Sequence, residues 1–248
     1  MKRVGLSATA LAALLGAAGC ATPGPLHVYS VGAPQAAEIS DFGDQPGKTS
    51  VPSFLEGEDV AAGMAYDPFT DHFFVRLEPG NRILVVDRPA RAVKRRFTVA
   101  EMPATGGGDL AIRPQSGHVF LLRPGEPALD EITRYGEWIR VIPLESAPAA
   151  ATKAIAYDSI RDRLLVLFGA DQVVPYTRDG KNEGTPRKLD RAVGPSLGFD
   201  AERRELYAPL AGPDQRIGIF NEEGRLLRTL EAVAIGVDVG PRSFLRMF

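Results

Sequence analysis

Short apolar strands recur along this chain at intervals of roughly 38 to 46 residues, and this repeat constrains the fold more than any other feature. The repeat is marked by Ala65-Tyr66-Asp67, Ala111-Ile112-Arg113, Ala156-Tyr157-Asp158, Gly198-Phe199-Asp200 and Gly236-Val237-Asp238. A second marker agrees, because Gly136, Gly180 and Gly224 recur at equal intervals between later strands, where a hairpin turn needs a positive φ. Strand repeats of this length are typical of β-propeller blades.

The repeats predict an all-β fold, a β-propeller of five four-stranded blades, with six blades as the alternative if Asp44–Glu58 contains further strands. The fifth repeat begins at Ala234–Asp238 and continues as Ser243–Phe248, which supplies only two strands. We therefore expect His27–Val31 and Ala36–Phe42 to serve as its third and outer strands. Strands from both ends of the chain would then close the ring and leave no hydrophobic edge unpaired.

Length and charge limit the number of domains and the kinds of partner. The chain has 248 residues and a regular repeat, so we expect a single β-propeller domain over residues 26–248. Its formal net charge is −2, and the basic residues Lys2 and Arg3 lie in a segment that we expect to be removed. This balance argues against nucleic acid as a partner.

The first 19 residues have the pattern of an export signal. Lys2 and Arg3 are followed by an apolar run and then by small residues before Cys20, the single cysteine. Ala17-Ala18-Gly19-Cys20 resembles the lipobox of bacterial lipoproteins, which implies that Cys20 is lipidated and becomes the mature N-terminus, with residues 20–25 as a short linker. Several acyl chains would anchor the protein stably in a membrane. Ala21 after the cysteine resembles the sorting pattern for the outer membrane, with the periplasmic or the surface side left open.

Three families of propeller repeat are similar to parts of residues 61–248. The segment from Ala65 to Asp87 resembles the YVTN or YncE-like repeat, and the segments starting at Ala128 and Ile217 resemble NHL repeats. The segment from Ala151 to Gly180 looks like the SdiA-regulated propeller group. These resemblances imply a β-propeller fold. Proteins with such repeats include surface or periplasmic binding modules and metal-dependent hydrolases such as gluconolactonases, so the resemblances leave both functions open.

The candidate site lies where the inner strands of a propeller begin, around the mouth of its central channel. Loops between second and third strands open on the same face. The ligand-binding residues predicted there are Glu58, Asp59, Arg76, Asp109, Arg123 and Lys153, with Glu78, Asn81, Glu126, Asp171 and Gln172 nearby. We expect these to be mostly solvated loop charges, with some pairing of Lys153 to Asp109. No metal-ligand spacing and no catalytic motif is present in the sequence, so no metal ligand or catalytic residue is assigned.

Other conspicuous residues have a structural interpretation. Asp67, Asp158, Asp200 and Asp238 end the inner strands, where an aspartate caps a turn. Trp138 and the pairs Phe73-Phe74 and Tyr66-Phe69 are expected in the core between blades. The cationic residues Arg88, Arg91, Lys94, Arg95 and Arg96 crowd the outer edge of the first blade. They protect an exposed edge strand, or else they dock to anionic lipid or to an acidic partner.

The functional hypothesis is a lipid-anchored, non-enzymatic propeller that binds or scaffolds a protein or another envelope component. The alternative is a hydrolase of lactones or esters that uses Ca²⁺ held by Glu58, Asp59 and Asp109, since calcium prefers several oxygen ligands. Because His27 would begin a third strand, we expect the anchor to leave on the face that carries the candidate site. A membrane-proximal partner would follow from that arrangement.

Overall fold

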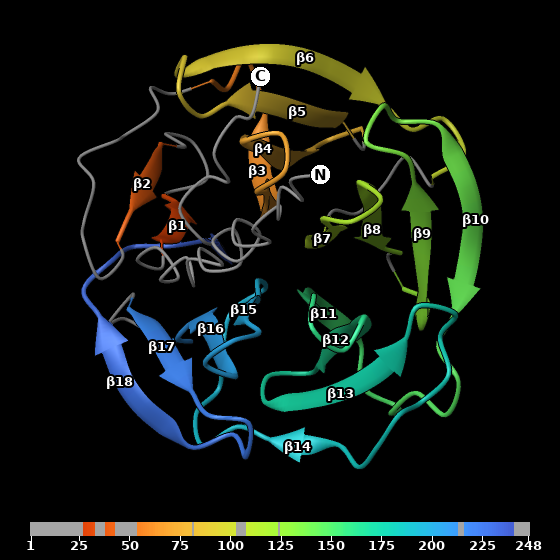
Figure 1. Cartoon of the computed structure of the whole chain (residues 1–248), viewed down its shortest axis with the longest axis vertical. Helices are drawn as coiled ribbons and strands as arrows, with labels where there is room; N and C mark the ends of the chain where they lie inside the picture. Colours follow the sequence, from red (N-terminus) through yellow and green to blue (C-terminus); the bar gives the residue numbers. More distant parts are fainter. Residues whose placement is uncertain are drawn as a thin grey trace, which may run out of the picture.

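The computed structural model describes residues 27–32, 38–42, 54–80, 82–102, 108–123, 125–212 and 216–240. These residues form five antiparallel sheets arranged around a central axis, as Figure 1 shows. The five-bladed β-propeller is therefore confirmed. The predicted signal segment, Cys20, the linker and the strand Ser243–Phe248 lie outside the described residues. Within the described ranges, no helix is long and apolar enough to cross a membrane.

Blades 1 and 2 each consist of four consecutive strands, ordered from the axis outward. Blade 1 contains β3 (Val60–Asp67), β4 (His72–Glu78), β5 (Arg82–Asp87) and β6 (Ala92–Thr98). Blade 2 contains β7 (Leu110–Arg113), β8 (His118–Leu122), β9 (Ala128–Ile132) and β10 (Trp138–Pro143). The repeat pattern of the sequence predicts these eight strands with bounds that differ from the observed ones by at most one residue at each end.

Blades 3 and 4 follow the same order. Blade 3 contains β11 (Thr152–Asp158), β12 (Arg163–Phe168), β13 (Gln172–Thr177) and β14 (Arg187–Lys188). Blade 4 contains β15 (Gly198–Asp200), β16 (Glu205–Pro209), β17 (Ile217–Phe220) and β18 (Leu226–Leu230). The repeat pattern predicts the outer strand of blade 3 at Thr185–Leu189, and the observed β14 is shorter.

Blade 5 closes the ring with strands from both ends of the chain, as predicted, but the order differs. Among the described residues it contains β19 (Gly236–Gly240), β1 (His27–Val31) and β2 (Ile39–Asp41). β1 pairs directly with the inner strand, from His27 opposite Gly240 to Val31 opposite Gly236. The prediction that His27–Val31 is a third strand was therefore wrong. All five residues of β1 are buried, which fits a second strand covered on both faces.

Five hydrophobic clusters fill the spaces between neighbouring blades. One joins blade 5 to blade 1 through Tyr29, Tyr66 and Phe73, whose rings lie 4.7 to 5.4 Å apart. The others join blades 1 and 2, blades 2 and 3, blades 3 and 4, and blades 4 and 5. Every blade thus packs on two neighbours, so the ring has no free end.

The turns confirm the predicted roles of the repeated glycines and of three of the four repeated aspartates. Gly136, Gly180 and Gly224 have φ values of 92°, 83° and 85°, in the left-handed region that favours glycine. Asp67, Asp158 and Asp200 each accept a backbone N–H from the turn that follows, at 2.9 to 3.2 Å.

Two aromatic residues expected in the core are exposed instead. Phe69 is 72% exposed and Trp138 is 41% exposed, whereas Tyr66, Phe73 and Phe74 are buried as predicted. Phe69 lies in the turn after β3, and Trp138 begins the outer strand β10. Neither position is covered by a neighbouring blade, which is why the prediction for these two residues was wrong.

Candidate functional site

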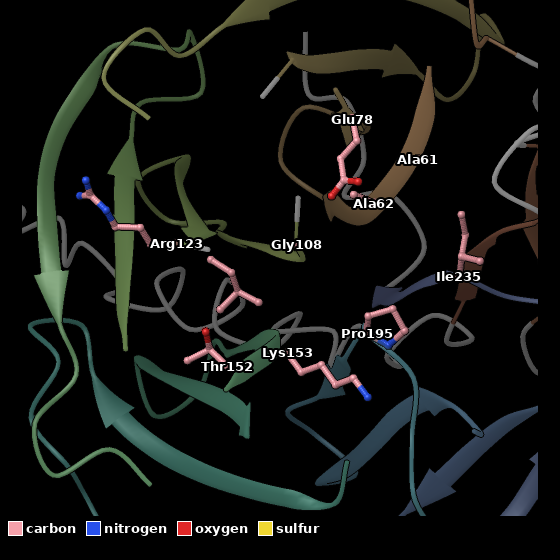
Figure 2. Close-up of a pocket in the computed structure, with 10 residues that line it drawn as sticks. Ala61, Ala62, Glu78, Gly108, Arg123, Thr152, Lys153, Pro195 and Ile235 are labelled. Carbon is pink, nitrogen blue, oxygen red and sulfur yellow. The ribbon is translucent and has the colours of Figure 1, made fainter. Parts of the chain in front are cut away.

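A cavity of about 390 Å³ lies on the propeller axis. Its walls come from the starts of all five inner strands and from the ends of β4 and β8, as Figure 2 shows. The lining residues are Ala61, Ala62, Glu78, Gly108, Leu122, Arg123, Thr152, Lys153, Pro195 and Ile235. We call the side on which the inner strands begin the mouth face, and the opposite side the far face.

Two side chains of opposite charge face this cavity. In Figure 2 the Glu78 carboxylate turns toward the axis beside Ala62, and the Lys153 side chain runs toward Pro195. Both residues are half-buried. Within the described part of the chain, no hydrogen bond or ion pair occupies either charged group. The cavity thus offers one acceptor and one donor on a wall that is otherwise mainly apolar.

Arg123 also lines the cavity, but its guanidinium is directed outward (Figure 2). It lies 3.4 Å from the Asp130 carboxylate on β9 and 3.2 Å from Glu126. Asp130 is buried, and this burial raises the pKa of its carboxyl, an effect that the nearby Arg123 opposes. Arg123 therefore contributes its aliphatic part to the wall, while its charge neutralises Asp130.

Arg76 is a fully buried cation in blade 1. Its Nη1 donates a hydrogen bond to the carbonyl of Leu122 in blade 2 at 2.8 Å. Burial lowers the pKa of Arg76 to about 10, and the charges of Asp130, Glu78 and Asp109 oppose that shift. The residue was predicted near the mouth as a ligand contact, and the structure places it in the packing between blades 1 and 2.

Asp109 is fully buried and ties several inner strands together at the axis. Its Oδ2 accepts the backbone N–H of Ile155 at 3.1 Å and that of Leu197 at 2.9 Å, which come from blade 3 and the segment leading into blade 4. Its Oδ1 lies 3.1 Å from the Ser196 hydroxyl, whose oxygen accepts the N–H of Val237 at 2.9 Å. Burial raises the pKa of Asp109 well above its usual range.

The approach of Asp109 requires glycine on the neighbouring strand. A Cβ on Gly63 would lie 2.7 Å from the Asp109 Cα, which is closer than real Cβ atoms come. The ring of bonds continues on the other side, where Asp238 accepts the N–H of Tyr66 at 2.7 Å. These contacts link inner strands around the axis and give Asp109 a structural role.

The six predicted ligand residues therefore fall into three groups. Arg123 and Lys153 line the cavity, whereas Arg76 and Asp109 are buried behind it. Glu58 is exposed on a turn, and the buried Asp59 forms an ion pair with Arg82. The expected pairing of Lys153 with Asp109 does not occur, because the Asp109 oxygens are used by backbone N–H groups and Ser196.

The sequence predicts only some of the residues that line the cavity. Glu78 was recognised as a neighbour of the mouth, while Ala62, Thr152 and Pro195 were missed. Their common signal is position, because each lies at or just before the start of an inner strand. Charge alone drew attention to Glu58 and Asp59, which lie in the loop before the first of those strands. Within the described residues, no group of three or more His, Cys, Asp or Glu side chains could hold a metal ion.

Comparison with known proteins supports the fold alone. No protein-family model matches the chain, and no curated protein matches it in sequence. A chain in a crystal structure of a nidogen/laminin complex is similar in structure, with a TM-score of 0.60 and 17% identity over 86% of this chain and 81% of that one. Glutaminyl cyclase from Myxococcus xanthus gives a TM-score of 0.52 and 12% identity, over 72% of this chain and 69% of that one. At such identities the likeness is one of architecture.

Proposed function

We propose that this chain is a non-enzymatic binding module of the cell envelope, which holds part of a protein or of another envelope component in its axial cavity. The observation that carries the proposal is the pair of Glu78 and Lys153, which face a cavity of about 390 Å³ and whose charged groups form no hydrogen bond or ion pair among the described residues. A volume of this size lies within the range of ligand sites. A ligand that presents a hydrogen-bond donor to Glu78 and an acceptor to Lys153 would pair with both groups.

The class of ligand is inferred from the side chains that line the cavity. Glu78 would accept hydrogen bonds from an ammonium or amide group, and Lys153 would donate to a carboxylate. Ala61, Leu122 and Ile235 would contact an aliphatic part between the two polar ends. A peptide segment or chain end has this combination of groups, and peptide stems are present in bacterial peptidoglycan.

The lipid anchor is the second part of the proposal. Lipidation of Cys20 would attach the protein to a membrane, and the sorting pattern after Cys20 favours the outer membrane. Incorporation of radiolabelled palmitate into the wild-type chain, and its loss in Cys20→Ser, would support this assignment. A Cys20→Ser variant that stays in the membrane fraction would contradict it.

Binding in the cavity is tested by thermal unfolding of residues 21–248, which include every described strand. A soluble peptidoglycan digest is the probe. A ligand that binds only the native state raises its stability by RT ln(1 + [L]/Kd). We expect the digest to raise the Tm of the wild type, and we expect Glu78→Gln and Lys153→Met to reduce that rise.

Lys188→Met is the matched control, because Lys188 is an exposed lysine of the same blade on the outer strand β14. This substitution also removes one lysine charge, but at a position that does not line the cavity. A Tm rise of equal size in the wild type, both cavity variants and the control would contradict binding at the axial cavity.

The calcium-dependent hydrolase alternative gains no support from the geometry. Asp59 is engaged by Arg82, Asp109 by backbone N–H groups, and Glu58 is an exposed turn residue. The two hypotheses differ in their response to metal. Unfolding with millimolar calcium and with a chelator should give the same Tm for a binding module, whereas a clear rise with calcium would favour the hydrolase.

A further inference from the structure

Three large apolar side chains are exposed in turns of the far face. Phe69, Tyr135 and Ile160 are 72%, 66% and 64% exposed. Phe69 lies between β3 and β4, Tyr135 between β9 and β10, and Ile160 between β11 and β12. Since β3 and β11 begin at the cavity and β9 begins on the same side, all three turns lie on the opposite side of the ring. They belong to three successive blades.

Arginine side chains accompany these apolar tips. The guanidinium of Arg134 lies 5.3 Å from the centre of the Phe69 ring, and that of Arg95 lies 5.1 Å from the centre of the Tyr135 ring. Arg95 also lies against the Phe97 ring and donates a hydrogen bond to the Arg134 carbonyl, but it has no carboxylate partner among the described residues. The exposed Arg91, in the turn between β5 and β6, has none there either. Of the five cationic residues at the edge of blade 1, these two keep an uncompensated charge.

Side-chain contacts join the turns of Phe69, Arg91 and Tyr135, and the turn of Ile160 contacts blade 2. Arg88 forms an ion pair with Asp71, which joins the turn of Arg91 to the turn of Phe69. The Gln115 amide donates to the carbonyl of Ser159 at 3.1 Å, which joins blade 2 to the turn of Ile160. We call Phe69, Arg91, Arg95, Tyr135 and Ile160 the far-face patch.

β1 begins on the same side of the ring. His27 lies opposite Gly240, whereas the other end of β19 begins next to Ile235 in the cavity wall. His27 is therefore at the far face, so the expectation that the anchor leaves beside the candidate site loses its premise, which was that His27 begins a third strand. Six residues lie between Cys20 and His27, and the seven extended steps from one to the other span at most about 25 Å.

We propose that the far-face patch rests on the anionic leaflet that holds the lipid anchor, so that the cavity opens away from that membrane. This inference rests on the proposed lipidation of Cys20. Aromatic and aliphatic tips on a rigid face insert shallowly at the headgroup level, and uncompensated arginines bind lipid phosphates. A lipid surface satisfies both features of the far-face patch at once, within the reach of the short linker.

The test uses the mature lipidated protein in vesicles of phosphatidylcholine and phosphatidylglycerol. Cys20 is the single native cysteine, and its thiol is consumed by lipidation, so an introduced cysteine takes a fluorophore selectively. Labels are placed in the patch by Phe69→Cys and Ile160→Cys. The controls are Ala62→Cys at the mouth face and Leu227→Cys, an exposed residue of blade 4. Nitroxide-labelled lipids and aqueous iodide serve as quenchers.

We expect the labels at positions 69 and 160 to lose fluorescence to the nitroxide lipids, and those at positions 62 and 227 to lose it to iodide. Vesicles of phosphatidylcholine alone should weaken the lipid quenching, because the arginines then lack anionic partners. Lipid quenching at position 62 instead of 69, or equal quenching at all four positions, would overturn the proposal. Shielding of position 69 from both quenchers would show that protein covers the patch, which also overturns it.

Flotation separates this inference from the proposed anchor. If the wild-type protein fails to float with the vesicles, lipidation of Cys20 is wrong and the docking inference loses its basis. If the protein floats but positions 69 and 160 stay open to iodide, the anchor stands and the docking inference alone is wrong.

Discussion

At the scale of single residues, Asp109 shows how a charged residue close to a cavity serves the fold. Its two oxygens receive hydrogen bonds from blade 3, from the segment before blade 4 and from Ser196, which in turn binds blade 5. Backbone groups at the crowded axis cannot all pair within their own sheets, so a buried acceptor completes their hydrogen bonding. The same carboxylate draws attention in the sequence as a ligand candidate, because composition does not distinguish these roles.

We predict that Asp109→Ala is strongly destabilising and that Asp109→Asn is much less so. Alanine leaves the N–H groups of Ile155 and Leu197 buried without acceptors, at a cost of roughly 2 to 6 kcal/mol in unfolding free energy. Asparagine keeps one acceptor oxygen for both groups and directs its amide toward Ser196, whose hydroxyl can turn to the Val237 carbonyl. Urea unfolding measures both values, and equal losses for the two variants would contradict the hydrogen-bond role.

A pH dependence follows from Asp238. Burial raises the pKa of its carboxyl from 3.8 to about 7. The native state therefore keeps a proton that the unfolded chain has lost, so this group contributes stability at low pH that is lost as the pH rises through about 7. We expect the urea midpoint of the wild type to fall between pH 4 and pH 7 more steeply than that of Asp238→Asn.

Other groups titrate in the same range, so the informative quantity is the difference between the wild type and the variant. Asp179→Asn is the control for loss of a carboxylate, because Asp179 lies on an exposed turn. The interpretation fails if Asp238→Asn follows the wild-type slope while differing only in its overall stability.

At the scale of strands and blades, the sequence predicts most of what the structure contains. The first four blades follow from local patterns, namely period-two alternation, Asp-capped turns such as Asp67, and glycine at positions such as Gly136. The order within blade 5 did not follow, because pairing between the two chain ends is non-local and the apolar strand HVYSV suits a second and a third position equally. The sequence predicts where the cavity lies, but only some of the residues that line it. Its wall uses small residues such as Ala62 and Pro195, which carry no chemical signal.

A disulfide can test the corrected order of blade 5. Ser30 lies opposite Val237 in the β1 and β19 pair. Facing Cα atoms in an antiparallel pair are about 4.5 to 5.5 Å apart, within the range of a disulfide. We predict that Ser30→Cys with Val237→Cys, combined with Cys20→Ala, forms an intramolecular disulfide that a gel-mobility shift on reduction detects.

The control pair is Ser40→Cys with Val237→Cys. Ser40 faces Ser30 from the next strand outward, so β1 separates it from Val237 by about two strand spacings, roughly 9.5 Å. If a further strand lay between β1 and β19, the Ser30 pair would be equally distant and would not cross-link. That result would restore the order first expected from the sequence.

At the scale of the whole molecule, ring closure determines how the protein loses its structure. In open repeat arrays each unit contacts only its neighbours, and unfolding can start at the ends. Here β1 and β19 join the two ends of the chain in one sheet, and all five spaces between blades are filled by hydrophobic clusters. Opening any blade therefore exposes two apolar interfaces at once, which favours unfolding in a single step.

Trp138 makes this cooperativity measurable, because it is the single tryptophan and reports on blade 2 alone, whereas far-ultraviolet circular dichroism reports on all blades. We predict that the two signals follow the same urea transition in residues 21–248.

Deletion of residues 27–42 removes β1 and β2, opens the ring and exposes the edge of β19. In that variant the circular dichroism transition should shift to lower urea and separate from the Trp138 transition, since blade 2 lies away from the opened edge. Separate transitions in the intact chain would mean that the blades unfold independently, in spite of the closed ring.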